Sequence, residues 1–120
     1  MKKWSLVVIS LLMLVACSKD PKGLPEAYFT YLDKGEITEA GKLLSKQVTA
    51  MAGEVKVKAM LQKQAKQLQQ KGGINSISTE GETKGEMGEY TAHIVFKDGS
   101  KKDEKVSLIK EDDGWKISPK

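Results

Sequence analysis

The stretch Lys71-Gly72-Gly73-Ile74-Asn75-Ser76-Ile77 divides the 120-residue chain into two halves with different hydrophobic periodicity. Before it, apolar residues recur every three or four positions, which indicates helices. After it, apolar and polar residues alternate, which indicates strands with one buried face. The Gly-Gly pair terminates the last helix. Helices followed by strands predict an α+β fold, with the helices packed on one face of a curved, four-stranded antiparallel sheet.

Three helices are expected before this junction, at about residues 25–34, 37–44 and 54–70. The buried face of the first helix follows helical spacing and comprises Pro25, Tyr28, Phe29 and Leu32. The spacing within residues 45–53 is ambiguous, and we expect a break or kink near Gly53.

Four strands are expected after the junction, at about residues 74–83, 90–97 and 102–110, with a short last strand at residues 115–117. In the second strand one set of alternating residues faces the core, namely Tyr90, Ala92, Ile94 and Phe96. His93 lies on the opposite face, so we expect it to meet solvent or a partner.

The N-terminus has the pattern of an exported protein. Lys2 and Lys3 precede a segment, residues 4–16, that is apolar except for two serines. A membrane span needs about 20 apolar residues, so this segment suits a signal peptide better. Leu14-Val15-Ala16-Cys17 resembles the bacterial lipobox. That resemblance implies a signal peptide over residues 1–16, a diacylglycerol-modified Cys17 that anchors the chain to a membrane, and a tether over residues 17–24.

The residue after the lipobox cysteine bears on location. In Gram-negative lipoproteins an aspartate there is the usual inner-membrane mark, whereas this chain has Ser18. The resemblance therefore implies the periplasmic side of the outer membrane in a Gram-negative cell. In a Gram-positive cell it implies the outer face of the plasma membrane. Either way, we expect a protein of the cell envelope.

Charge and composition exclude several classes of function. Removing the leader lowers the formal net charge from +4 to +2, and the chain contains no Arg. Nucleic-acid binding is therefore not expected, because such domains are more basic and use Arg. One His and one Cys, the latter assigned to lipidation, leave no set for a metal site or a catalytic triad. We expect no cofactor.

Three groups of residues resemble the small bacterial lipoproteins of the DUF4878 type, within the NTF2-like (cystatin-like) group. They are the helical residues Phe29, Leu32, Gly35-Glu36 and Ala40, the junction 71–77, and the tail 106–117. The resemblance implies that the NTF2-like domain, residues 25–118, is a cone with helices in its concave face. The family has no established activity, so it implies no chemistry. NTF2-like domains often dimerise through the sheet, and a homodimer stays open.

Tyr28, Tyr90 and Trp115 either line a small apolar pocket in the mouth of the cone or fill the core. NTF2-like enzymes place an Asp or His base beside a Tyr donor inside the cone. Here no carboxylate is expected among the inward positions. We therefore expect a non-catalytic binding or accessory module for an envelope protein or a small apolar ligand.

Two alternatives stay open. One is an enzyme of the isomerase or hydrolase kind that uses Tyr90 or His93 inside the cone. The other is a scaffold that binds through the outer sheet face, formed by Thr91, His93, Val95, Lys105, Ser107 and Ile109. The lysines of the third helix are expected to form a solvated face, although they could meet anionic lipid headgroups or cell-wall polymers.

Overall fold

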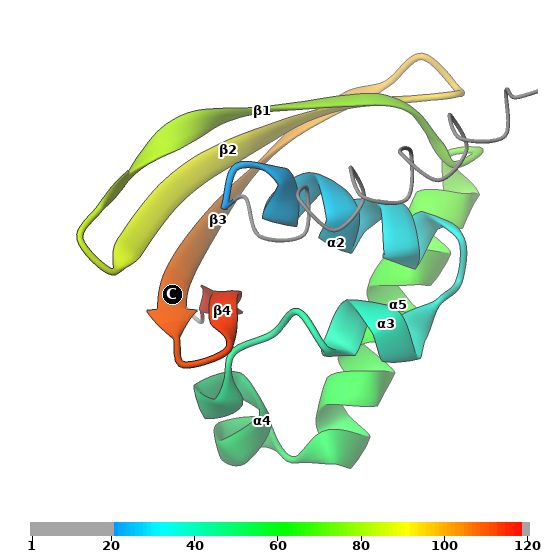
Figure 1. The fold of residues 1–120 in the computed structure, drawn as a ribbon. Helices are drawn as coiled ribbons and strands as arrows, with labels where there is room; N and C mark the ends of the chain where they lie inside the picture. Colours follow the sequence, from blue (N-terminus) through cyan, green and yellow to red (C-terminus); the bar gives the residue numbers. More distant parts are fainter. Residues whose placement is uncertain (1–20, 119–120) are drawn as a thin grey trace, which may run out of the picture.

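Four helices precede a four-stranded antiparallel sheet in the computed structural model, which describes residues 21–118 (Figure 1). The helices are α2 (Gly23–Asp33), α3 (Ile37–Gly41), α4 (Lys46–Ala52) and α5 (Glu54–Gln70). The strands are β1 (Ile74–Lys84), β2 (Met87–Phe96), β3 (Lys101–Glu111) and β4 (Gly114–Ser118), and each pairs with the next in sequence. Helix α2 lies across the concave face of the curved sheet. The expected α+β, cone-like arrangement is confirmed.

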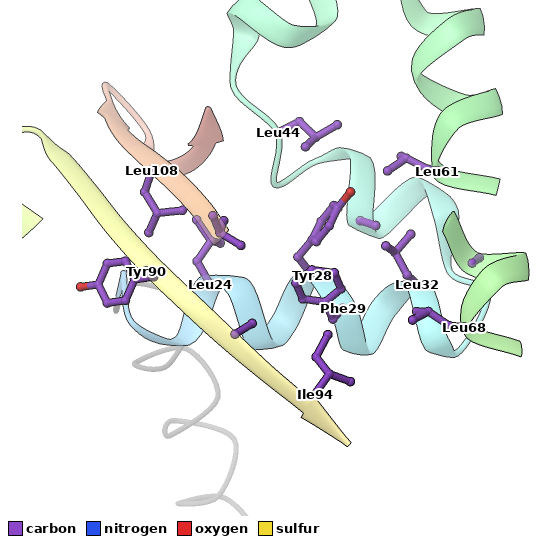
Figure 2. Packing of buried hydrophobic residues seen from close by; sticks show 14 of the residues in the cluster. Leu24, Tyr28, Phe29, Leu32, Leu44, Leu61, Leu68, Tyr90, Ile94 and Leu108 are labelled. Carbon is purple, nitrogen blue, oxygen red and sulfur yellow. The ribbon is translucent and has the colours of Figure 1, made fainter. Parts of the chain in front are cut away.

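The register places one face of the sheet in the core. Tyr90 pairs with Gly81 of β1 and with Val106 of β3, and Ile94 pairs with Ile77 and Lys102. The inward residues of β2 pack with the apolar faces of α2 and α5 in one buried cluster (Figure 2). The alternation of the second strand therefore predicts the inner face correctly.

The junction between helix and sheet is held by backbone hydrogen bonds. Gly72 and Gly73 both have positive φ (85° and 90°), which favours glycine. The Gly73 carbonyl accepts from Lys97 N at 2.9 Å, so the junction is fixed against the β2–β3 turn. Asp33 Oδ1 accepts from Ile74 N at 3.1 Å, which joins the end of α2 to the start of β1.

Several bounds differ from expectation: α3 ends at Gly41 instead of residue 44, and β2 begins at Met87 instead of residue 90. Helix α2 begins at Gly23, and Leu24 is only 5% exposed, so the last two residues of the expected tether belong to the folded domain. Residues 46–52 form a separate helix, α4, because Ser45 Oγ accepts from Val48 N at 3.3 Å and caps its first turn. Gly53 (φ 85°) then turns the chain into α5.

The expected signal peptide at residues 1–16, the expected lipidation site Cys17, and Ser18 lie outside the described residues. Within residues 21–118, none of the helices has both the length and the apolar character that crossing a membrane requires.

Candidate functional site

A cavity of about 340 Å³ lies between α2, α5 and the inner face of the sheet. Pockets for small molecules usually measure about 300–1,000 Å³. The apolar lining comes from both helices and three strands: Tyr28, Phe29, Leu32, Leu68, Ile94, Phe96, Val106 and Ile117. The polar lining comes from α5 and its C-terminal end and from β3 and β4: Gln64, Gln67, Lys71, Lys102, Glu104, Lys105, Ser107 and Ser118. The cone is therefore not completely filled by its own side chains.

Tyr28 places a hydroxyl group within this apolar lining. It comes from the buried face of α2 and is 6% exposed. Its hydroxyl donates to Gln64 Oε1 at 2.9 Å, and its ring packs edge-on against Phe29 with centroids 5.1 Å apart. Burial, and after it the negative charge of Glu104, raise the pKa of Tyr28 to about 12. The phenol is therefore a neutral hydrogen-bonding group at physiological pH.

Glu104 supplies an inward carboxylate, contrary to the expectation that the inner face has none. It pairs with Ala92, which is fully buried, and it lines the cavity. Lys102, two residues earlier on the same face, forms a salt bridge with it at 2.8 Å. Counting back by twos from Val106 gives this inward position. The strongly charged start of the strand hid it at the sequence level.

The free edge of β3 forms one side of the cavity. Strand β4 pairs with β3 only from Ser107 to Glu111, so the earlier half of β3 has no strand on that side within residues 21–118. Exposed lysines at positions 102 and 105 line the cavity here. Lys71, at the C-terminal end of α5, also lines the cavity, and its Nζ lies 5.4 Å from the centroid of the Phe96 ring. The arrangement suits a ligand with an apolar body and a polar group near the edge.

Of the three aromatic residues for which pocket lining and core filling were both open, only Tyr28 lines this cavity. Tyr90 is buried farther along the sheet, and Leu24 lies between it and Tyr28 in the view of Figure 2. Its ring occupies the space above Gly81, where a Cβ atom would collide with it. Trp115 is half-buried on β4 and packs against the edge of the core. Alternation gave the face of each residue but not its depth in the cone.

His93 lies on the outer face of the sheet, as the alternation predicts. Nδ1 lies 2.8 Å from Asp103 Oδ1 on β3, and Nε2 lies 3.0 Å from Glu80 Oε2 on β1. The hydrogen bond with Asp103, followed by that with Glu80, raises the pKa of His93 above its usual value. A mechanism that uses His93 inside the cone is excluded, because its side chain lies on the opposite face.

The outer residues do not form a metal site in the described part of the chain. Within residues 21–118, no group of three His, Cys, Asp or Glu side chains is arranged to hold a metal ion. His93 is instead a link between β1 and β3 across β2, because its two ring nitrogens contact carboxylates on both neighbouring strands. The sequence indicated the outward direction of His93 but not these partners.

Comparisons with known proteins give two findings. The family model for the domain of unknown function DUF4878 matches residues 15–118. The fold is similar to a crystal structure from Campylobacter jejuni described as a "Putative NTF2-like transpeptidase", with a TM-score of 0.71 and 17% sequence identity. The similarity covers 84% of this chain and 99% of that one. No curated protein matches the chain.

Proposed function

Because the chain belongs to the DUF4878 family and has an NTF2-like fold, we propose that it is an envelope lipoprotein whose cone binds a small amphiphilic molecule without catalysis. The observation that carries the proposal is the cavity, in which the Tyr28 hydroxyl lies among apolar side chains and the Glu104 carboxylate lies at the polar edge beside Lys102. Apolar walls with a few placed polar groups are typical of ligand pockets. Lipidation at Cys17 would hold the domain at a membrane.

The binding part of the proposal is tested by filling the cavity. Val106→Phe adds volume inside the cone, whereas Val95→Phe adds the same volume on the outer face of the sheet. We expect saturable binding of an anionic apolar dye by the wild type and by Val95→Phe, and at least tenfold weaker binding by Val106→Phe. Cooperative unfolding of each protein would show that it is folded. Equal dye binding by all three folded proteins would contradict the cone as the binding site.

The anchoring part of the proposal has its own test. Cys17→Ala should leave the protein uncleaved at residue 16 and without a lipid, whereas Ser18→Ala keeps the cysteine and serves as the control. The measurements are metabolic labelling with a tagged fatty acid and the mass of the purified protein. A Cys17→Ala protein that is still labelled and still cut before residue 17 would contradict lipidation at this residue.

One observation favours an enzyme as the second candidate. Glu104 supplies the carboxylate that a proton-transfer reaction needs, and its charge is close enough to influence Tyr28. Glu104→Gln would then abolish turnover of a bound substrate while binding persists. The name of the Campylobacter jejuni neighbour suggests acyl transfer instead. That chemistry commonly uses a Cys–His or Ser–His pair, and no Cys or His lines the cavity within residues 21–118.

A further inference from the structure

An exposed apolar elbow lies where α4 turns into α5. It comprises residues 50–55, Ala-Met-Ala-Gly-Glu-Val, and Gly53 makes the turn with a positive φ of 85°. Met51 is 73% exposed and Val55 is 84% exposed, although both are large apolar residues. Helix α4 has no buried residue at all, so its packing leaves this surface uncovered. The elbow lies at the end of the helical layer away from β1 and β2 (Figure 1).

Positive charge is in excess along α5, the helix that begins at the elbow. Residues 42–71 contain seven Lys and one acidic residue, Glu54, whereas the rest of the described chain has an excess of acidic residues. Lysines 56, 58, 63 and 66 of α5 are all exposed. None of their ammonium groups lies within salt-bridge distance of a carboxylate in residues 21–118. Positive charge therefore lies on the helix that follows the exposed apolar elbow.

The outward face of α5 combines these two features. At 100° per residue, the buried positions 57, 61, 65 and 68 cluster on one side of the helix. The opposite side carries Val55, Lys56, Lys63 and Lys66. A helix surface with apolar residues at its tip and lysines beside them is typical of contact with a bilayer interface, where lysines meet anionic headgroups.

We propose that the α4–α5 elbow is a second membrane contact, which inserts Met51 and Val55 at the surface of a bilayer that carries anionic lipid. The expected anchor at Cys17 is six residues from Gly23, a span of about 20 Å at full extension. That tether would keep the domain within reach of headgroups. The lipid proposal at Cys17 and the elbow proposal can fail separately, because the elbow is tested without the lipid.

The test uses the unlipidated domain from Ser18 onward and vesicles of phosphatidylglycerol and phosphatidylcholine. This fragment contains all of the buried core cluster, which runs from Leu24 to Leu108, and so can fold without the leader. We expect it to sediment with the mixed vesicles and not with phosphatidylcholine alone. Met51→Ser combined with Val55→Ser should weaken binding at least tenfold. Each Lys→Gln change at position 56 or 63 should weaken it about fivefold.

Two matched controls distinguish binding through the elbow from non-specific binding by other exposed apolar or basic residues. Met87→Ser changes another exposed methionine, 56% exposed, in the β1–β2 hairpin, and Lys97→Gln removes an exposed lysine next to the β2–β3 turn. Both should leave binding unchanged. A second readout is Val55→Trp, whose fluorescence should be quenched by lipids brominated in the acyl chain. Absence of binding to anionic vesicles, equal effects of the control changes, or no quenching would overturn the proposal.

Discussion

Replacement of Tyr28 by Phe removes one hydroxyl group from the cone and keeps the ring. In the wild type this hydroxyl donates to Gln64 Oε1 at 2.9 Å, in a partly buried site. A hydrogen bond of this kind contributes about 1 kcal/mol to the free energy of unfolding. At about pH 8 the phenol is neutral in the native and the unfolded chain. We therefore expect Tyr28→Phe to be less stable than the wild type by about 1 kcal/mol at that pH.

The sign of this difference should reverse at alkaline pH. Burial raises the pKa of Tyr28 to about 12 in the folded protein, against an ordinary value of 10.0. Between these values the unfolded chain loses a proton that the native chain keeps, so the wild type loses stability as pH rises. The loss is about 1.4 kcal/mol by about pH 11 and about 2 kcal/mol by about pH 12. The Phe variant lacks this loss and should become the more stable protein.

Urea unfolding of both proteins at a series of pH values, followed by far-ultraviolet circular dichroism, measures the difference directly. Other titrations are common to the two proteins and cancel. Glu104→Gln should lessen the alkaline loss in the wild-type background, because the charge of Glu104 is the smaller of the two causes of the raised pKa. A stability difference that stays constant from about pH 8 to about pH 11 would refute the reasoning, because it would mean that the hydroxyl is not desolvated.

Two further predictions concern the sheet. Gly81→Ala should lower the free energy of unfolding by about 3 kcal/mol in thermal unfolding, because φ is +150° and a Cβ atom would overlap the Glu89 carbonyl and Tyr90 Cα. The control Gly99→Ala, with open space around the residue, should lower it by about 1 kcal/mol. Equal losses in the two variants would contradict this packing. The pKa of His93 is higher in the folded protein than in the unfolded chain, because the charged ring binds two carboxylates. Its contribution to the free energy of unfolding is therefore complete below about pH 6.5 and is lost as the pH rises through the pKa of the folded protein. His93→Gln should remove this pH dependence. In an NMR titration, Asp103→Asn should lower the pKa of the His93 ring more than Glu80→Gln does. The opposite order would contradict Asp103 as the main cause of the raised pKa.

The local hydrophobic pattern was sufficient to predict the four strands, the longer helices and the buried face of the sheet. The bounds expected for the long helix, residues 54–70, are those of α5. The alternation in β2 gave both the buried residues and the outward direction of His93. These features follow from periodicity within one element, which the sequence displays directly.

Features that depend on contacts between elements were missed. Helix α4 is short, and its apolar residues Val48, Met51 and Ala52 have helical spacing, but none of them is buried and the phase of the pattern changes after Gly53, so the pattern did not identify a separate helix. Glu104 is different, because alternation back from Val106 already gives its inward position, but the neighbouring charges suggested a solvated strand. The choice between pocket lining and core filling for Tyr28, Tyr90 and Trp115 required their positions along the cone, which depend on register and curvature. The residues that surround the cavity come from α2, α5 and three strands.

The most direct test of a ligand-binding cone is a crystal structure of the protein purified from the cells that produce it naturally. We expect electron density for a small molecule in the cavity, with its apolar part against Phe29 and Leu68 and a polar group near Tyr28 or Glu104. A cavity closed by its own side chains, or one that holds water alone, would contradict ligand binding in the cone.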